Sequence, residues 1–234
     1  MAVQLAVKGD IVDDQTAQMY EFFNMPCCNP QAITDALAQA NGQDIELQIA
    51  SNGGDVFAGS EIYTALKAYT GQVTCQVVGL AASAASIIAM AGDKVQMSPV
   101  AQLMIHQAWT DNEGNSDSMN HTADVLNSLD GSIVNAYMLK TGLDQNTIMK
   151  MMSDETWMSA QAAVDKGFAD EIMFVDATQP VVMNSLSSIP SKQTVNDFLN
   201  FMAKKKAADS SGQKIKNEKE NKKALLQRKL GLLF

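Results

Sequence analysis

The strongest constraint on the fold of this chain is the alternation of strand-like and helix-like segments over its first half. Five stretches have the apolar pattern of strands, at residues 3–11, 45–51, 72–79, 94–99 and 101–107. Helical patterns separate the first four of these stretches. Alternation of this kind predicts an α/β fold, in which helical crossover connections join strands that run parallel to one another.

Helical patterns dominate the part of the chain that follows. A long helix is predicted from Ser118 to about residue 140, because apolar residues recur at every fourth position. These residues are Val125, Leu129, Ile133 and Tyr137. A second helix is predicted within 141–152, and a third begins at Ser159, whose hydroxyl is a suitable cap.

The composition changes near residue 178, which predicts a folded domain at 1–178 followed by a linker and a charged tail at 179–234. Residues 192–234 hold 11 of the 17 Lys and Arg residues but only 4 of the 26 Asp and Glu residues. The rest of the chain is therefore acidic, which disfavours nucleic acid as a partner of the folded part. We expect the polar, basic tail to be mobile.

Other features of the whole chain are typical of a cytoplasmic protein. No apolar run reaches the roughly 18 residues of a transmembrane candidate, so we expect no membrane partner. The first residues lack the pattern of a secretory signal. Cys27, Cys28 and Cys75 have neither the even number of a disulfide framework nor the spacing of a zinc site. We therefore expect no metal and no cofactor.

Candidate catalytic bases are few, because the chain has only two histidines. His121 lies among polar residues and is expected on a solvated helix face. His106 lies at the end of a predicted strand, where the functional groups of α/β folds gather. The alternative interpretation of His106 is a core histidine that is satisfied by hydrogen bonds.

Two turns that contain Gly or Ser complete the set of candidates. The pair Gly53-Gly54 follows a strand and precedes a helix. Its backbone N–H groups could bind an anion, or the pair could simply form a tight turn. Ser83 and Ser86 lie where another strand meets a helix, at which a serine can be a cap or a nucleophile. These residues alone leave both interpretations open.

Three short blocks resemble, in their order and spacing, motifs of the ClpP family of self-compartmentalising serine proteases. They are S-N-G-G-D-V at 51–56, G-L-A-A-S-A-A at 79–85 and M-I-H-Q at 104–107. V-D-D at 12–14 and W-M-S-A-x-x-A-V-x-x-G-x-A-D-E-I at 157–172 also match. The resemblance thus covers roughly residues 5–176 and implies a ClpP/crotonase-like fold of repeated β-β-α or β-α units.

The resemblance assigns catalytic roles to the residues that match. Ser83 would be the nucleophile and His106 the general base. The backbone N–H groups of Gly53 and Ala84 would form the oxyanion hole. Ser86 falls where the family has a small packing residue, so we interpret it as structural.

The third member of the triad falls on Glu155, with the adjacent Asp154 as the alternative. Either carboxylate could orient the histidine, and either could instead cap a helix end. The resemblance also implies that an extended substrate pairs with main chain on both sides of the site. The substrate-binding residues would be Gly54, Asp55, Val56, Gln107, Ala108 and Trp109.

The chain departs from the family pattern at several positions. Asn52 replaces the proline of the Gly-Gly turn, and Ala84-Ala85 replace a larger residue and a glycine. The first strand begins at about residue 3, which leaves no room for the family's axial loop and makes an ATPase partner doubtful. The helix predicted over 118–140 matches the family's protruding handle, which implies assembly into homo-oligomeric rings. Packing of that helix on its own domain is the alternative.

These implications predict a serine endopeptidase that acts on a protein or peptide substrate through an acyl-enzyme. The E-T-W-M-S-A block at 155–160 and the chain length resemble the ClpP-like head maturation proteases of phages and prophages. A capsid or scaffold protein in the host cytoplasm is therefore the expected substrate. The alternatives are an ATP-dependent Clp proteolytic subunit with an unfoldase partner, a crotonase-like acyl-CoA-binding protein, and a non-catalytic assembly protein.

Overall fold

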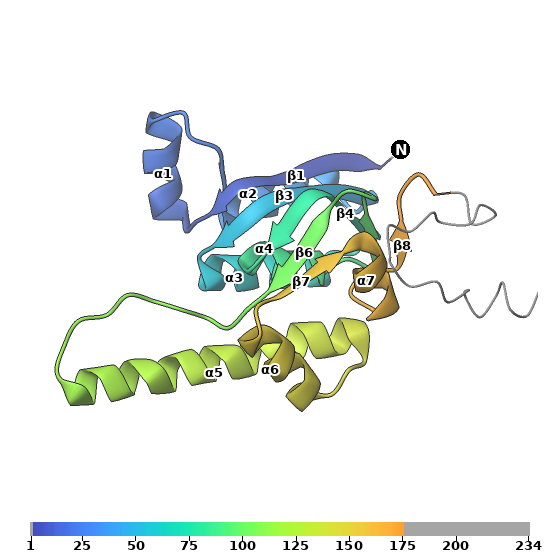
Figure 1. The fold of residues 1–234 in the computed structure, drawn as a ribbon. Coiled ribbons are helices and arrows are strands. Elements are labelled where there is room, and N and C mark those ends of the chain that lie inside the picture. Colours follow the sequence, from blue (N-terminus) through green and yellow to red (C-terminus); the bar gives the residue numbers. More distant parts are fainter. Residues whose placement is uncertain (1, 176–234) are drawn as a thin grey trace, which may run out of the picture. The chain divides into compact units, whose positions relative to one another are not determined.

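A computed structural model describes residues 2–175, and a single sheet runs through these residues (Figure 1). The strands are β1 (Val3–Ile11), β2 (Cys27–Cys28), β3 (Ile45–Gly54), β4 (Val73–Ala82), β5 (Lys94–Met97), β6 (Gln102–Ile105), β7 (Thr156–Ser159) and β8 (Glu171–Ile172). Their order is β2-β1-β3-β4-β5-β8, and β6 pairs with both β4 and β7. The β6–β7 pair is antiparallel and the other pairs are parallel. The structure therefore confirms the predicted α/β fold.

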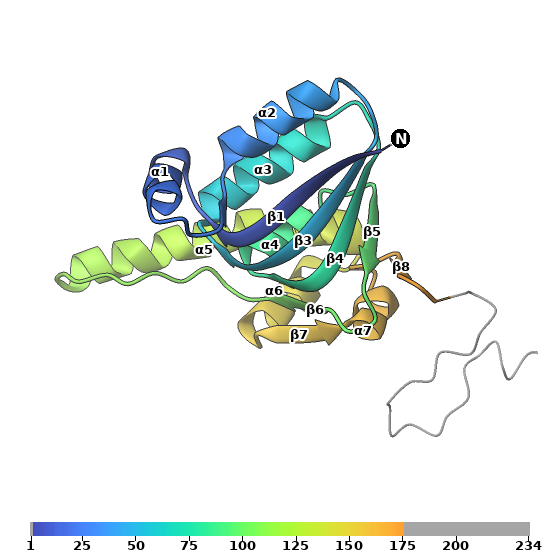
Figure 2. The ribbon, with the colours of Figure 1, turned by 90° about the horizontal axis from the view of Figure 1, so that it is seen from above.

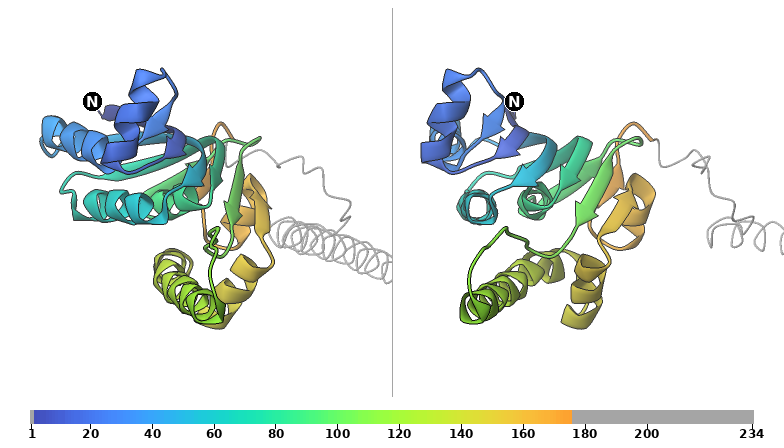
Figure 3. Two further views of the ribbon diagram at one scale, coloured as in Figure 1. Left: turned by 90° about the vertical axis from the view of Figure 1, so that its left-hand side faces the viewer. Right: turned by 60° about the vertical axis from the view of Figure 1, so that its left-hand side comes forward.

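Helices connect the strands and cover the sheet. They are α1 (Asp14–Phe22), α2 (Pro30–Ala40), α3 (Val56–Ala68), α4 (Ala84–Ala89), α5 (Ser116–Thr141), α6 (Gln145–Ser153) and α7 (Ala160–Asp165). Helices α2, α3 and α4 contact one another in that order, and α4 packs on β3 and β4. Figure 2 shows α2 and α3 side by side along the sheet, and Figure 3 shows α5 farther from the sheet.

Several helix starts follow the local signals that the sequence contains. The carboxylate of Asp13 accepts hydrogen bonds from the backbone N–H groups of Gln15 and Thr16, so it caps α1. Pro30 opens α2, where its missing N–H costs nothing. The hydroxyl of Ser159 accepts a hydrogen bond from the Ala162 N–H at 3.3 Å, which confirms it as the cap of α7.

The structure also contains two strands that the sequence patterns do not predict. Strand β2 is the dipeptide Cys27-Cys28, which is too short to show any periodicity. Strand β7 has only Met158 buried among its four residues, because it lies at the edge of the sheet. Such short segments become strands through their partners, here β1 and β6, and not through their own composition.

The apolar core lies in the central strands, in which buried positions alternate with less buried ones. The side chains with no exposed surface in these strands include Val7, Leu47, Ile49, Val77 and Leu103. Burial of each such side chain stabilises the fold by about 1.5–3 kcal/mol relative to exposure. This alternation places one face of each strand in the core, because successive side chains of a strand point to opposite faces of the sheet.

Strand β4 changes its partner part of the way along, and this change positions the candidate site. Its first half pairs with β5, ending at Val77↔Met97. Its last three residues pair instead with β6, ending at Ala82↔Met104. The carboxyl ends of β3, β4 and β6 are consequently neighbours at one edge of the sheet.

The long helix α5 confirms the helix predicted from Ser118 and exceeds it by a few residues. Its buried residues all lie in its C-terminal half, from Asp130 to Tyr137. The N-terminal half extends beyond the sheet, as a handle would (Figures 1 and 2).

The predicted linker and tail at 179–234 lie outside the described residues. Among residues 2–175, no helix is both long and apolar enough to cross a membrane.

Candidate active site

Three of the segments singled out from the sequence meet at the carboxyl ends of neighbouring parallel strands. Gly53-Gly54 ends β3, Ser83 follows β4 directly, and His106 follows β6 directly. The backbone N–H of Ser83 donates to the carbonyl oxygen of Met104 at 3.1 Å, which ties the end of β4 to β6. This edge is where α/β sheets place their ligand sites.

Ser83 sits in a strained turn between β4 and α4. Its φ of 54° lies in the left-handed region, which a residue with a Cβ rarely adopts. It occupies the N-cap position of α4, yet among the described residues its hydroxyl makes no capping hydrogen bond. The turn therefore presents an uncommitted hydroxyl at the start of a helix.

A glycine is required at position 53 because β3 approaches this turn so closely. A Cβ on Gly53 would lie 2.7 Å from the Cβ of Ser83 and 2.7 Å from the carbonyl oxygen of Ala82. Its φ of +99° is also unfavourable for any other residue. Only a glycine lets the end of β3 lie directly against Ser83.

Ser83 and His106 line one cavity of about 320 Å³. One side of this cavity is formed by residues that follow the Gly-Gly turn, and the other by residues that follow His106. The lining includes Gly54, Asp55, Val56, Phe57, Ala84, Ile87, Gln107, Ala108 and Trp109. The structure thus brings together Ser83, His106, Ala84 and all six residues predicted to bind substrate.

The apolar stripe of α5 faces this cavity. Val125, Leu129, Ile133 and Tyr137 all contribute to its lining. Ile133 and Tyr137 are buried within the chain's own domain, whereas Val125 is exposed, and the contact between rings expected for this helix stays a prediction. The stripe therefore forms an apolar wall of the candidate site.

The two glycines of the turn have different hydrogen-bond environments. The N–H of Gly53 donates to the hydroxyl of Ser51 at 3.0 Å, and that hydroxyl donates to the Gly9 carbonyl at 2.6 Å. Gly53 is buried, whereas Gly54 is exposed and lines the cavity. The predicted oxyanion donor Gly53 is therefore already engaged in this structure.

Gly54 is free to offer its own N–H to the cavity. Ile11 and Gly54 are partners in the β1–β3 ladder, and the Asp55 N–H donates to the Ile11 carbonyl at 2.8 Å. In a parallel ladder a residue bonds to the two residues that flank its partner. The N–H of Gly54 consequently points away from β1, on the side opposite to the bonds that Gly53 and Asp55 make with Ile11.

The first N–H groups of α4 are the second set of donors at this site. Ala84 is the first residue of the helix, and the first turn of any α-helix has N–H groups without an intrahelical acceptor. Ala84 also lines the cavity beside Ser83. Its role as an oxyanion donor stays a prediction.

Ser86 has a structural role. Its side chain is completely buried, and its hydroxyl donates to the carbonyl oxygen of Ser83 at 2.6 Å. The hydroxyl of Tyr137, on α5, lies 2.8 Å from the same Ser86 oxygen and can donate to it. Burial raises the pKa of Tyr137, so this phenol keeps its proton. Ser86 therefore links α5 to the turn that holds Ser83.

The carboxylates of Glu155 and Asp154 bind residues other than His106 in this structure. The antiparallel pairing of β6 and β7 ends at Ile105↔Thr156. His106 comes after Ile105 and Glu155 comes before Thr156, so their backbones lie at the same end of the strand pair. The Glu155 carboxylate accepts a hydrogen bond from Trp157 Nε1 at 3.1 Å, and that of Asp154 pairs with Lys150 Nζ at 2.8 Å. Neither residue belongs to the cavity lining.

Two residues that support the site, Ser51 and Asp130, have no role among the predictions from the sequence. Both side chains are buried, and each bonds to a segment that lines the cavity or adjoins it. The sequence does contain a signal for Asp130, which is its place on the apolar face of the predicted helix. It lies three residues before Ile133, four before Val134 and seven before Tyr137, which are all buried on α5. A carboxylate on an apolar helix face needs partners from another segment.

No group of three or more metal-ligating side chains occurs within residues 2–175. The groups that the cavity lining offers to a substrate include the hydroxyl of Ser83, the imidazole of His106 and the backbone N–H groups described above.

Comparisons with known proteins agree on one family. The family model described as Clp protease matches residues 31–176. An "ATP-dependent Clp protease proteolytic subunit" of Deinococcus radiodurans is 31% identical over 133 residues, which is 56% of this chain and 65% of that protein. The protein of that name from Ligilactobacillus salivarius is 36% identical over 138 residues, which is 58% of this chain and 70% of that protein.

A relative from Chlamydia caviae matches over a longer stretch. This "ATP-dependent Clp protease proteolytic subunit 1" is 33% identical over 177 residues, which is 70% of this chain and 92% of that protein. The match to the Deinococcus radiodurans protein, by contrast, spans slightly less than two thirds of its length.

Proposed function

The chain belongs to the Clp protease family, and from this premise we propose that it is a serine endopeptidase that uses Ser83 as its nucleophile. The observation that carries the proposal is that Ser83 and His106, from two different strand ends, line the same cavity. Family membership alone would not require these two side chains to meet.

The mechanism that we propose is acyl transfer. His106 takes the proton of the Ser83 hydroxyl as the oxygen attacks a peptide carbonyl, and it then returns this proton to the leaving amine. Backbone N–H groups of Gly54 and Ala84 bind the oxyanion, and we favour Gly54 because the Gly53 N–H is engaged by Ser51. Water activated by His106 then hydrolyses the acyl-enzyme.

We assign the third position of the triad to Glu155. The β6–β7 register brings its backbone to the same end of the antiparallel pair as His106. A change of side-chain rotamer, away from Trp157, would direct its carboxylate elsewhere at little cost because the residue is exposed. Asp154 lies one residue farther from the pair and is bound to Lys150.

The substrate that best fits the cavity is an extended peptide with an apolar side chain near the scissile bond. Main chain at 54–56 and at 107–109 lies on the two sides of the cavity, and α5 supplies its apolar wall. An extended segment between these two stretches would bind by strand addition.

A capsid or scaffold protein is the natural substrate that we propose. The support is the resemblance of the E-T-W-M-S-A block at 155–160 to phage head maturation proteases. An ATP-dependent proteolytic subunit is the second candidate, supported by the names of the relatives from Deinococcus radiodurans and Chlamydia caviae. Both candidates would act as homo-oligomeric rings. Cleavage of casein only with an unfoldase and ATP would favour the second candidate.

Labelling with a fluorophosphonate tests the proposed nucleophile. We expect the full-length protein to gain one adduct by intact mass, mapped to Ser83 by peptide analysis. The adduct is expected to be lost in Ser83→Ala and His106→Ala and kept in Ser60→Ala, which removes an exposed hydroxyl on α3. A folded protein that gains no adduct, or one that is still labelled after Ser83→Ala, would contradict the proposal.

A further inference from the structure

The described part of the chain has three buried polar side chains, and all three support the candidate site. They are Ser51, Ser86 and Asp130. Ser51 binds the Gly53 N–H, and Ser86 binds the Ser83 carbonyl. Asp130 binds the segment that follows His106. Burial of a polar group is unfavourable without partners, so this clustering marks where the fold requires fixed geometry.

Asp130 uses both of its carboxylate oxygens to hold two consecutive residues. Oδ1 accepts a hydrogen bond from the backbone N–H of Ala108 at 2.7 Å, and Oδ2 accepts one from Gln107 Nε2 at 3.0 Å. The residue is 3% exposed, and it projects from α5 onto a segment that precedes this helix in the chain. These two bonds give both oxygens of the buried carboxyl group a partner.

The segment that Asp130 holds has no regular structure of its own. Strand β6 ends at Ile105, and the chain forms neither helix nor strand again until α5 begins at Ser116. His106 is the first residue of this connection and Gln107 is the second. The bonds to Asp130 therefore fix the connection immediately after the proposed general base.

The opposite side of the site is tied to the same helix. Tyr137 lies seven residues, or about two turns, after Asp130 on α5 and contacts Ser86, which binds the Ser83 carbonyl. One rigid helix thus contacts the Ser83 turn at one point and the His106 segment at another.

We propose that Asp130 is a positioning residue, which sets His106 and the segment 107–109 relative to Ser83. This inference rests on the proposed function of Ser83 and His106. It also refines the expected substrate contacts, because the N–H of Ala108 is engaged by Asp130 and is not available to a bound peptide.

The test compares Asp130→Ala with Asp130→Asn and with a matched control, Val134→Ala. Val134 is buried on the same helix but does not belong to the cavity lining, so its truncation destabilises α5 without removing the hydrogen bonds that Asp130 makes to Gln107 and Ala108. The rate of fluorophosphonate labelling of Ser83 is measured at a temperature at which circular dichroism shows every variant folded.

We expect Asp130→Ala to label about 10- to 100-fold more slowly than wild type, since small displacements of catalytic groups have effects of this size. Asp130→Asn is expected to stay within about threefold of wild type, because its Oδ1 can accept from Ala108 and the Gln107 amide can turn to accept from its Nδ2. Val134→Ala is expected to label at the wild-type rate despite a lower unfolding midpoint.

Amide hydrogen exchange supplies a readout that does not depend on activity. The Ala108 amide is expected to exchange faster in Asp130→Ala than in wild type and in Val134→Ala. If Asp130→Ala does not fold, Gln107→Ala removes one of the two bonds, and we expect it to slow labelling by a smaller factor. The inference is overturned if wild type is labelled and the folded variants at Asp130 and Gln107 are labelled equally fast. Absence of labelling in wild type would instead contradict the proposed function.

Discussion

At the scale of single residues, the site depends on groups whose hydrogen bonds are already committed. Ser83 adopts a left-handed φ, and its carbonyl is held by the hydroxyl of Ser86. Glycine is needed at Gly53 because β3 approaches Ser83 so closely. The hydroxyl of Ser83 and the N–H groups of Gly54 and Ala84 remain as groups that can act on a substrate.

The assignment of the third triad member leads to a prediction at this scale. We expect Glu155→Gln to lower the rate of peptide hydrolysis by at least about tenfold, because the imidazolium that forms in the transition state loses its counter-charge. Asp154→Asn is the matched control and is expected to change the rate less than about twofold. Its exposed pair with Lys150 is of a kind worth about 0.2–1 kcal/mol, and only to stability.

The measurement is the steady-state hydrolysis rate of a peptide substrate by each variant. A larger effect of Asp154→Asn would transfer the role to Asp154. Wild-type rates in both variants would show that the site acts without a carboxylate from this segment.

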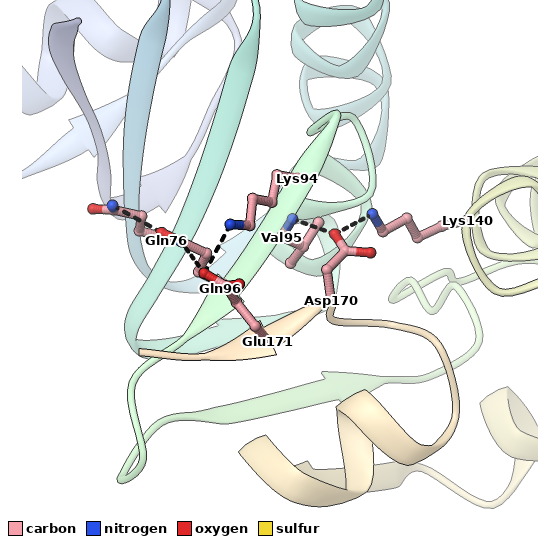
Figure 4. A network of polar contacts seen from close by, with 7 residues as sticks. All are labelled: Gln76, Lys94, Val95, Gln96, Lys140, Asp170 and Glu171. Atoms are coloured by element: carbon pink, nitrogen blue, oxygen red, sulfur yellow. Dashed lines mark hydrogen bonds and ion pairs between the residues drawn. The ribbon is translucent and has the colours of Figure 1, made fainter. Parts of the chain in front are cut away.

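At the scale of elements, short strands and the last turn of α5 depend on side chains that join them. Strand β8 has two residues, and its neighbourhood is held by a polar network with β5 and α5 (Figure 4). Asp170 Oδ2 accepts from the Val95 N–H at 2.6 Å and from Lys140 Nζ at 2.7 Å. This single carboxylate therefore joins the C-terminal end of α5 to an outer strand of the sheet.

Removal of this carboxylate has a predictable effect on stability. We expect Asp170→Ala to lower the free energy of unfolding by about 1–3 kcal/mol, because the Val95 N–H and the Lys140 ammonium both lose a partner. The Lys140 side chain is only 11% exposed, so water does not readily replace the lost contact. Urea unfolding followed by circular dichroism measures the change.

Glu171→Ala supplies the comparison for this experiment. The Lys94–Glu171 pair has side-chain exposures of 42% and 46%, so we expect a loss of no more than about 1 kcal/mol. Equal losses in the two variants would mean that the network acts through the salt bridges and not through the buried backbone donor.

At the scale of the whole molecule, two buried thiols in the core make the stability of the fold decrease at alkaline pH. Cys75 is fully buried, and burial raises its pKa from 9.0 to about 12. Burial also raises the pKa of Cys28 to about 12. Both thiols therefore stay protonated in the folded chain at pH values at which they ionise in the unfolded chain.

The sign of the effect follows from this difference in bound protons. Above pH 9 the unfolded state binds fewer protons than the folded state, so stability is retained below about pH 9 and falls as the pH rises toward 12. We expect the urea midpoint of wild type to be lower at pH 10.5 than at pH 8. Cys75→Ala should be less stable at pH 8 but should lose less stability over this interval. An equal loss in both proteins would contradict the burial of this thiol.

Local sequence patterns determined much of the architecture. The alternation of apolar stretches predicted a parallel sheet with crossover helices, and Ser159 marked a helix start that the structure contains. Such signals depend on residues within a few positions of one another, so they survive without knowledge of the fold. The same patterns, with the motif resemblance, directed attention to Ser83 and His106.

Tertiary structure alone decided the features that depend on partners distant in the chain. The N–H of Gly53 is engaged and that of Gly54 points away from β1 because of how β3 pairs with β1 and where Ser51 lies. Asp130 reaches Ala108 only because α5 folds back over the connection after β6. Hydrogen-bond direction and burial are properties of packed neighbours, and no local pattern along the chain encodes them.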